Sequence, residues 1–485
     1  MDGLPDRSGL AQDKCGVAGI AAERDVAPAL YQAMRAIQHR GQESAGIATF
    51  DDGLQTIKGM GLVENIFQAK ELEQLTGRVG LGHTRYSTAG TSRLENAHPV
   101  CVSSAEGSIA LGHNGEIVNA DGIREDLQES GWAFITDNDS EVIVRLFANE
   151  LSDAKSPVRA MRRVMRQIVG AYSLVLVVGE RILAVRDPRG IKPLALGKLP
   201  AAYGGQNGSE SEVGGYAVAS ETVAIEALGG EPIRDVKPGE IVEITPGGYE
   251  GHMTNAQSAD LAHCQFEYVY FSRADSRIDD REVYDVRVGI GEQLANESPV
   301  DADIVVPVPD SGRSHALGFA RQLDLPMAEG LMKNRYVHRT FIMPSQEERA
   351  SGVNIKLNPV QSVVEGNRVV LVDDSIVRGT TMGQLTDMLR EAGAEEVHVR
   401  IGCPPIQAPC YLGIDMKTRE ELIAADKSVE EIRDTIGADS LAYVSIPGLK
   451  RAIGKPEGSL CTGCLTGRYP VDIPGEEHRK QETLF

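Results

Sequence analysis

The sequence has a shortage of basic residues. Lys and Arg total 49 against 70 Asp and Glu in 485 residues, so the formal net charge at pH 7 is -21. Such an acidic surface repels phosphate backbones and anionic headgroups, which argues against broad binding of nucleic acid or membranes. A phosphate ligand must therefore be bound by a local arrangement of groups and not by the overall field of the protein.

Long apolar runs are also missing. The longest one, near Tyr172 to Gly179, is far shorter than the roughly 20 residues that a membrane span needs. Residues 1–14 contain no apolar core of a secretory signal. We therefore expect a cytoplasmic protein with no membrane partner.

Cysteine is scarce, with seven residues, which argues against a secreted scaffold held by disulfides. Their clustering is more informative, because Cys461 and Cys464 form a C-x-x-C pair with Cys264, Cys403 and Cys410 upstream. In a cytosolic protein this pattern indicates a metal or iron–sulfur site. The spacing alone favours Zn²⁺ and leaves an iron–sulfur cluster or spare thiols open.

The length fits about three average domains or two large ones. Short strands and turn signals dominate the first half, which predicts a layered α/β sandwich of mostly antiparallel strands, with a polar Gly/Ser-rich surface insertion at 200–215. From about Cys264 strands and helices alternate. The apolar run Arg368–Val372 is typical of a parallel strand buried on both faces, in a doubly wound sheet that binds ligands at the carboxyl ends of its strands.

We place the domain boundary near residues 245–265. The predicted parts are a leader at 1–14, a first domain at 15–250, a second domain at 260–455, and a segment at 456–485 that carries the C-x-x-C pair and a mobile tail.

The sharpest motif is the string VVLVDDSIVRGTT at 369–381. A buried strand delivers two adjacent carboxylates, and a short loop leads into a helix whose N-terminus, backbone N–H groups and hydroxyls can bind an anion. The carboxylates can bind ribose hydroxyls or Mg²⁺. An ordinary turn with a hydroxyl cap is the alternative. The motif predicts a ribose-5-phosphate cradle made by Asp373, Asp374, Ser375, Arg378, Gly379, Thr380 and Thr381.

This string resembles the phosphoribosyl pyrophosphate (PRPP) signature of type I phosphoribosyltransferases. The resemblance implies that the loop Pro309–Gly312, with Asp310 and Ser311, binds the pyrophosphate, and that Ser311 joins Asp373 and Asp374 at a Mg²⁺ ion. The basic segment from Lys333 to Lys356 suits a lid that closes on phosphates, with Lys333 as a PRPP contact. A solvated loop is the alternative for that segment.

Cys15 heads the first predicted strand and is a candidate nucleophile if the leader is removed. Cleavage after Lys14 would place an α-amino group, with a pKa of about 8, beside the thiol as its base. A small buried residue is the alternative.

Three further positions could complete a site around this thiol. Arg85 could bind a carboxylate by a bidentate contact. Asn114 and Gly115 could form an oxyanion hole from one side-chain amide and one backbone N–H. Asp139 could bind an α-ammonium group. A hairpin turn at Asn114 and Gly115 and a helix cap at Asp139 are the alternatives.

Together these residues resemble the glutaminase domain of N-terminal-nucleophile amidotransferases, through the strings CGVAG at 15–19, HRGQESAGI at 39–47, GHTRYST at 82–88, HNG at 113–115 and DSE at 139–141. A glutaminase domain followed by a PRPP domain resembles the amidophosphoribosyltransferase family, from Cys15 to about Tyr469. The resemblance implies an αββα sandwich followed by a type I phosphoribosyltransferase domain. One departure is Asn354, where an arginine is usual.

The implied reaction is hydrolysis of glutamine at Cys15 and internal transfer of ammonia to PRPP. The products would be 5-phosphoribosylamine, glutamate and pyrophosphate, at the first step of de novo purine synthesis. The resemblance further implies a homotetramer inhibited by purine nucleotides. One branch of the family has a cleaved leader and a structural [4Fe–4S] cluster, for which the matching ligands are Cys264, Cys410, Cys461 and Cys464. Cys101 and Cys403 would then be buried thiols.

Two alternatives to this function stay open at the level of sequence. Another amidotransferase of the same nucleophile class, such as a hexosamine-phosphate synthase, would lack the string at 373–381. A catalytically inactive PRPP-sensing regulator would not need Cys15, Arg85, Asn114 and Asp139 together, and would carry a basic DNA-binding element, which the sequence does not contain.

Overall fold

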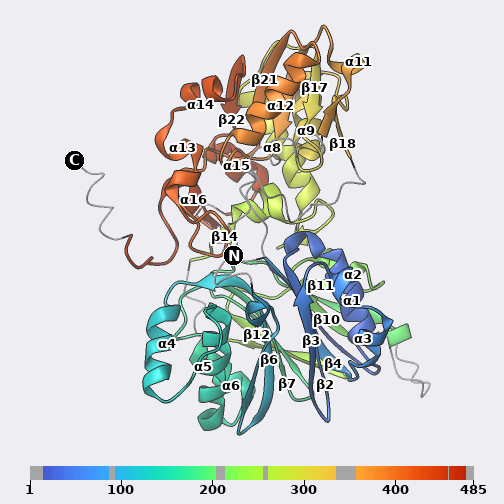
Figure 1. The fold of residues 1–485 in the computed structure, drawn as a ribbon, viewed down its shortest axis with the longest axis vertical. Helices are drawn as coiled ribbons and strands as arrows, with labels where there is room; N and C mark the ends of the chain where they lie inside the picture. Colours follow the sequence, from blue (N-terminus) through green and yellow to red (C-terminus); the bar gives the residue numbers. More distant parts are fainter. Residues whose placement is uncertain are drawn as a thin grey trace.

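The computed structural model describes residues 15–86, 93–203, 213–254, 260–334, 357–456 and 458–476. Two domains are stacked along the long axis of the molecule (Figure 1). The predicted leader, the lid residues 335–356 with Asn354, and the tail residues 477–485 lie outside the described residues.

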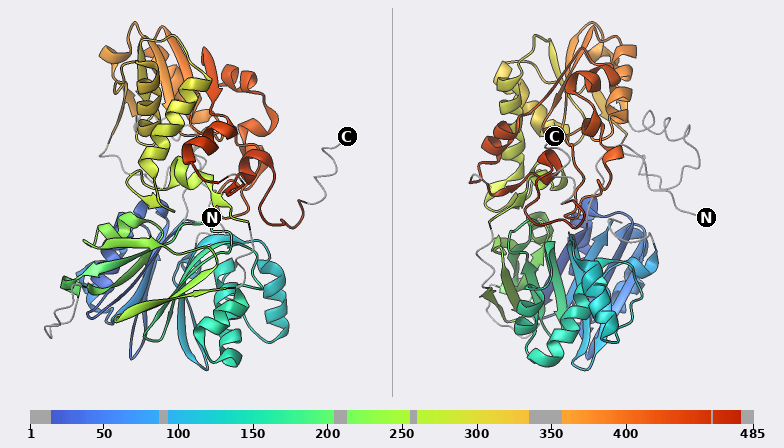
Figure 2. Two further views of the ribbon diagram at one scale, coloured as in Figure 1. Left: turned by 180° about the vertical axis from the view of Figure 1, so that it is seen from behind. Right: turned by 90° about the vertical axis from the view of Figure 1, so that its left-hand side faces the viewer.

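The first domain contains two antiparallel sheets packed face to face, with helices on both outer faces (Figures 1 and 2). The first sheet has the order β11-β9-β10-β1-β4-β2-β3 and the second β13-β12-β8-β7-β6-β5. This arrangement is the predicted αββα sandwich. Its strands are β1 (Gly16–Ala22), β2 (Ser44–Asp51), β3 (Gly53–Met60), β4 (Val79–Arg85), β5 (Val100–Ser104), β6 (Gly107–Ile117), β7 (Gly170–Val178), β8 (Ile182–Arg186), β9 (Ala195–Pro200), β10 (Val213–Ala219), β11 (Glu231–Asp235), β12 (Glu240–Thr245) and β13 (Gly248–Met253).

The small residues of β1 follow from its place at the centre of these layers. Every residue of β1 is buried, because the second sheet covers one face and a helix layer covers the other. A Cβ atom on Gly19 would lie 2.7 Å from Val175 Cγ1 of the second sheet. The helices of this domain are α1 (Ala27–Ala36), α2 (Val63–Ile66), α3 (Ala69–Glu73) and α7 (Thr222–Glu226) on the first sheet, and α4 (Ala120–Glu129), α5 (Asp139–Ala154) and α6 (Pro157–Val164) on the side of the second.

The second domain has a four-stranded parallel sheet in the order β17-β20-β21-β22, covered on both faces by helices. Along β20, Val370 and Val372 pack into one core with α8 and α9, while Val369 and Leu371 pack into another with α12. This explains the continuous apolar run and confirms the doubly wound phosphoribosyltransferase architecture. The strands are β17 (Ile304–Pro307), β20 (Arg368–Asp373), β21 (Glu396–Ile401) and β22 (Ser440–Tyr443).

The helices of this domain are α8 (Val283–Glu297), α9 (Gly312–Leu323), α11 (Gln361–Val364), α12 (Thr380–Glu391), α13 (Ile423–Asp426), α14 (Val429–Thr435), α15 (Ile446–Ile453) and α16 (Gly463–Thr466). Three small strand pairs complete it, namely β14 (His263–Cys264) with β23 (Leu460–Cys461), β15 (Arg277–Ile278) with β16 (Arg281–Glu282), and β18 (Leu331–Lys333) with β19 (Leu357–Pro359).

Two boundaries predicted from the sequence, that between the domains and that of the surface insertion, can be compared with the ends of strands. The interval 245–265 predicted for the boundary contains the end of β13 at Met253 and the start of β14 at His263. The predicted insertion at 200–215 was drawn too wide, because β10 begins at Val213 and pairs with β9. Residues 204–212 of that stretch lie outside the described residues. None of the helices within the described ranges has the length and apolar character to cross a membrane.

Candidate active sites and cysteine cluster

Cys15 lies immediately before β1, the central strand of the first sheet. Gly16 is opposite Thr84 in the pairing of β1 with β4, so the register places Cys15 beside Arg85. The thiol is almost fully buried, and its Sγ atom is 3.9 Å from the carbonyl oxygen of Tyr86. The end of β1 therefore holds the predicted nucleophile next to the predicted carboxylate-binding arginine.

Arg85 is itself held by Glu43. Its Nη1 donates to Glu43 Oε1 at 2.9 Å, and both side chains are largely buried. This contact fixes the direction of the guanidinium group. Sequence reasoning quoted the string that contains Glu43 but assigned it no role.

Asn114 and Gly115 lie within β6 and not in a hairpin turn, so that alternative is wrong. Asn114 is fully buried, and within the described part of the chain neither its amide oxygen nor its amide nitrogen has a hydrogen-bond partner. A buried amide without partners is costly, which favours a ligand at this position. Gly115 has φ +149°, and a Cβ atom there would lie 1.9 Å from the carbonyl oxygen of Ala171, so the position requires glycine.

Asp139 is the first residue of α5, but it does not cap that helix. The cap is Asn138, whose side chain accepts from the N–H of Glu141 at 3.0 Å. The Asp139 carboxylate instead accepts from the N–H of Ile117 at 3.0 Å and lies 3.6 Å from His113 Nδ1. Burial alone would raise the pKa of Asp139, but the charge and hydrogen bond of His113, with the Ile117 N–H, lower it below its ordinary value. The ionised carboxylate suits an ammonium ligand.

The second predicted site lies at the carboxyl end of β20. Asp373 and Asp374 are both buried, and Asp373 accepts from the N–H of Asp374 at 2.8 Å. Burial and the neighbouring carboxylate raise the pKa of Asp373 well above its ordinary value. Burial raises the pKa of Asp374 to about 7, against the opposing charge of Arg287. Within the described residues, Asp374 Oδ2 has no hydrogen-bond partner.

These two carboxylates fit a divalent cation. Oxygen ligands are what Mg²⁺ requires, and a cation would offset the burial of two adjacent negative charges. The hydroxyl of Ser311 hydrogen-bonds to Asp374 and belongs to the same group. Gly312 makes this approach possible, since a Cβ atom there would lie 2.5 Å from the carbonyl oxygen of Val372. The structure thus brings together the three predicted Mg²⁺ ligands.

The remaining predicted PRPP contacts are placed around this group. Gly379 has φ +79° before α12, and Thr380 and Thr381 are the first residues of that helix. Arg378 donates to Glu421 Oε1 at 3.0 Å. Ser375 donates to Asp374 Oδ1 at 3.2 Å.

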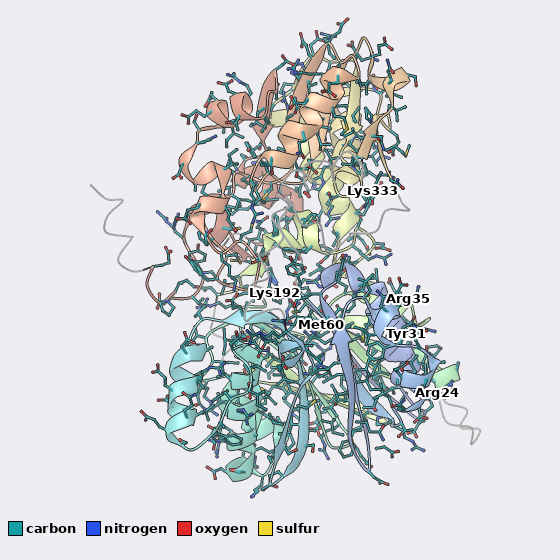
Figure 3. The ribbon with its side chains drawn as sticks, viewed as in Figure 1. Arg24, Tyr31, Arg35, Met60, Lys192 and Lys333 are labelled. Carbon is teal, nitrogen blue, oxygen red and sulfur yellow. The ribbon has the colours of Figure 1, made fainter. Side chains whose placement is uncertain are left out.

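Asp310 and Lys333 contact each other at the edge of this site. Lys333 Nζ donates to Asp310 Oδ2 at 2.6 Å, and both side chains are exposed. Lys333 ends β18, in the upper domain of Figure 3. The two predicted PRPP contacts therefore satisfy each other here, and binding of a pyrophosphate would have to break that pair.

The cysteines meet at the junction of the domains. β14 and β23 pair in parallel with Cys264 opposite Cys461, and Gln265 Nε2 lies 3.6 Å from Cys464 Sγ. The pKa of Cys461 is raised to about 12 by burial and by the neighbouring thiols of Cys264 and Cys410, and that of Cys464 is raised well above its ordinary value by burial and by Cys410. The four predicted ligands thus lie close together, with Cys264 and Cys464 buried and Cys410 and Cys461 partly buried.

Four thiolates can bind either a structural Zn²⁺ or a [4Fe–4S] cluster. Four thiolates around one zinc, each about 2.3 Å from it, would lie within about 4 Å of one another. A [4Fe–4S] cluster separates its thiolates further, because each binds a different iron.

Comparisons with known proteins agree with this geometry. Residues 83–211 match the family model of the glutamine amidotransferase domain, and residues 286–430 match that of the phosphoribosyl transferase domain. The chain is 51% identical to the amidophosphoribosyltransferase of Methanothermobacter thermautotrophicus, over 96% of each protein, and 46% identical to that of Synechocystis, over 100% of this chain and 97% of the relative.

The chain belongs to the amidophosphoribosyltransferase family. Its structure also matches the glutamine PRPP amidotransferase of B. subtilis complexed with ADP and GMP, with a TM-score of 0.86 and 42% identity, over 95% of this chain and 98% of that one. The reaction is that of the family, in which the amide nitrogen of glutamine is transferred to PRPP and glutamate and pyrophosphate are released.

A buried network of charged side chains joins the two domains beside the predicted nucleophile. Arg40 Nε donates to the carbonyl oxygen of Cys15 at 3.3 Å, and its Nη atoms donate to Glu221 at 2.7 Å and Glu267 at 2.8 and 3.0 Å. Burial disfavours the guanidinium charge, but both carboxylates outweigh it and raise the pKa of Arg40. Lys192, labelled near the junction in Figure 3, is fully buried with Nζ 3.8 Å from Glu267 Oε1.

Sequence reasoning missed this network and the role of Arg287. Arg40 stands in the string HRGQESAGI, but its partners lie 181 and 227 residues away, so no local pattern reveals them. Arg287 lies within α8, where it donates to the carbonyl oxygens of Tyr268 and Ser272 and its charge acts on Asp374. Only the folded chain brings these residues together.

Proposed function

We propose that Cys15, once its α-amino group is freed, attacks the side-chain amide of glutamine, and that Asn114 and Gly115 stabilise the oxyanion. Arg85 and Asp139 bind the carboxylate and ammonium of the substrate. The observation that carries this assignment is the buried Asn114 amide, which has no hydrogen-bond partner among the described residues and lies on β6, in the same domain as Cys15. Collapse of the tetrahedral intermediate releases ammonia and leaves a γ-glutamyl thioester, which water hydrolyses to glutamate.

We infer that removal of residues 1–14 is required for this step, because a free α-amino group is the base that an N-terminal cysteine uses. Support comes from the position of Cys15 at the start of β1.

At the second site, Asp373 and Asp374 bind the ribose hydroxyls, and with Ser311 they hold Mg²⁺. Bound there, Mg²⁺ would supply charge neutralisation for the departing pyrophosphate. The N-terminus of α12, with Gly379, Thr380 and Thr381, binds the 5-phosphate. Lys333 leaves the Asp310 carboxylate and donates to the pyrophosphate, while the loop that carries Asp310 and Ser311 lies against it. Ammonia then attacks C1 of the ribose and pyrophosphate leaves, giving 5-phosphoribosylamine for purine synthesis.

We place the enzyme in the iron–sulfur branch of the family, with Cys264, Cys410, Cys461 and Cys464 around a structural [4Fe–4S] cluster. Their proximity at the domain junction, in or against one hydrophobic cluster, supports this assignment. Anaerobically purified protein should absorb broadly near 400 nm and contain about four irons per chain. Cys461→Ser should lose both signals, whereas Cys101→Ser should keep them, because Cys101 is an exposed thiol on β5 of the first domain and not the buried thiol that the sequence predicted. A colourless wild type with stoichiometric zinc would contradict the assignment.

We further propose a cytoplasmic homotetramer inhibited by purine nucleotides. The binding of ADP and GMP by the similar B. subtilis enzyme supports nucleotide binding here. Light scattering should give four times the 52.2 kDa chain mass, and GMP or ADP should lower the rate of phosphoribosylamine formation.

The test of the whole proposal is glutamate release from glutamine by anaerobically purified protein, with and without PRPP and Mg²⁺. Strong stimulation by PRPP is expected if the two sites act together. Absence of release under both conditions, in folded protein with Cys15 confirmed as the first residue, would favour the regulatory alternative.

A further inference from the structure

A loop of the second domain lies directly against the strand that carries the predicted oxyanion hole. A Cβ atom on Gly413 would lie 2.7 Å from the carbonyl carbon of Gly115, 2.9 Å from its oxygen and 3.0 Å from the nitrogen of Glu116. The two backbones are therefore in van der Waals contact. Gly413 also has φ +90°, a conformation that favours glycine.

Gly115 is also close to a second backbone. A Cβ atom on Gly115 would lie 1.9 Å from the carbonyl oxygen of Ala171 in β7. Ala171 also belongs to the hydrophobic core of the second domain. The Gly115–Glu116 peptide is thus in contact with Gly413 of the second domain, and Gly115 also packs against Ala171 of its own sheet.

The loop that presents Gly413 is well supported. Cys410 N–H donates to the carbonyl of Met416 at 2.7 Å, and Met416 N–H donates to that of Ile414 at 2.8 Å. The side chains of Leu412, Ile414 and Met416 are buried in the core of the second domain. A rigid support transmits position better than a solvated loop, because close-packed interiors do not deform continuously.

A second contact holds the same stretch of β6. Lys417 Nζ lies 3.4 Å from Oε1 of Glu116, which is the residue after Gly115. Both side chains are partly exposed, so this pair contributes less than the backbone contact.

We propose that Gly413 is a positioning residue for the glutaminase reaction: its contact with the Gly115–Glu116 peptide fixes Gly115, and with it the Gly115 N–H, at the geometry that the oxyanion requires. Gly413 acts through Gly115 and does not contact glutamine. The inference rests on the proposed role of Gly115 in the oxyanion hole. Oxyanion stabilisation depends on donors held within a few tenths of an ångström, so a shifted Gly115 peptide lowers kcat more than it weakens substrate binding.

The test is Gly413→Ala, whose Cβ atom must displace backbone. We expect kcat for glutamate release with PRPP to fall at least about 10-fold, while KM for glutamine changes less than about 3-fold. Ammonia-dependent synthesis of phosphoribosylamine, alkylation of Cys15 by iodoacetamide and the absorbance near 400 nm should stay within about 2-fold of the wild type.

The matched control is Gly366→Ala. Gly366 has φ +74°, so alanine meets similar backbone strain there, but no heavy atom lies within 4 Å of the added Cβ. Equal glutaminase kcat in the two variants would overturn the inference, as would an equal loss of glutamine-dependent and ammonia-dependent rates in folded Gly413→Ala. An inactive wild type would refute the proposed function itself, which separates the two failures.

If Gly413→Ala does not fold, Lys417→Gln tests the same support. Its glutaminase kcat should be about 2- to 3-fold below that of Lys427→Gln, which alters an exposed lysine bonded to Thr435, with ammonia-dependent rates unchanged. Equal kcat values in these two lysine variants would contradict the inference.

Discussion

In the glutaminase site the charged groups are paired within the fold, whereas in the phosphoribosyltransferase site two buried carboxylates lie side by side. His113 and the Ile117 N–H keep the pKa of Asp139 low, and Glu43 holds Arg85. Burial instead raises the pKa of both Asp373 and Asp374, and the neighbouring Asp374 carboxylate raises that of Asp373 further. The first site is built to bind a zwitterion whose charges match its own, and the second needs a cation before both of its carboxylates can ionise.

The largest effect should come from Cys15→Ala, which separates the two sites. Glutamine-dependent synthesis should fall by roughly three orders of magnitude or more, because no other group can form the thioester. Ammonia-dependent synthesis should stay near the wild-type rate, measured as pyrophosphate release from PRPP with ammonium chloride. Loss of both activities in folded protein would argue against two independent sites.

Asp374→Asn should have opposite effects on activity and stability. Both glutamine- and ammonia-dependent synthesis should fall about 100-fold, because the variant loses one charge at the ribose and metal site. The variant should nevertheless be more stable than the wild type at pH 8 without Mg²⁺, by about 1 kcal/mol or more, since one of two adjacent buried charges is gone.

The pH dependence of stability follows from the same carboxylate. Its pKa is about 7 in the folded protein and about 4 when unfolded, so between these values the folded state binds more protons. The free energy of unfolding of the metal-free wild type should therefore fall as pH rises from about 4 to 7. Chemical denaturation across this range should show a shallower fall for Asp374→Asn. Identical slopes would contradict the assignment of a raised pKa.

Arg40→Met tests the paired charges at the domain junction. It removes the guanidinium that Glu221 and Glu267 share, which should cost about 3–5 kcal/mol of unfolding free energy. Arg78→Met, which removes an exposed pair with Glu23, should cost less than about 1 kcal/mol. Denaturant titrations measure the unfolding free energy of both variants. A similar decrease in both would mean that the junction network stabilises the fold no more than an exposed ion pair does.

The smallest effect should come from Glu43→Gln, which weakens the support of Arg85 without removing it. The side-chain amide oxygen of the variant can still accept a hydrogen bond from Arg85 but carries no charge, so KM for glutamine should rise roughly 5-fold. The kinetics with ammonia should not change. An unchanged KM would mean that Arg85 needs no help in binding the substrate carboxylate.

Much of this arrangement was predictable because local strings carry it. The apolar run before Asp373 and the glycine-bearing turn after it define a strand, a loop and a helix within thirteen residues. The sequence allowed a hairpin turn at Asn114 and a helix cap at Asp139. The structure excludes both, because Asn114 lies within β6 and Asn138 caps α5. Contacts between distant segments could not be read from the sequence. Arg40 with Glu267, and Gly413 with Gly115, meet only because the second domain packs against the ends of the first domain's strands.

The most direct test of a joined pair of sites follows the nitrogen atom. The wild type would receive glutamine labelled with ¹⁵N in its amide, together with PRPP, Mg²⁺ and an excess of unlabelled ammonium. The account predicts that the phosphoribosylamine carries mainly ¹⁵N, because ammonia passes inside the protein from Cys15 to the ribose. A product labelled only at the ratio of the bulk ammonium would show that the ammonia leaves the protein, and would contradict the account.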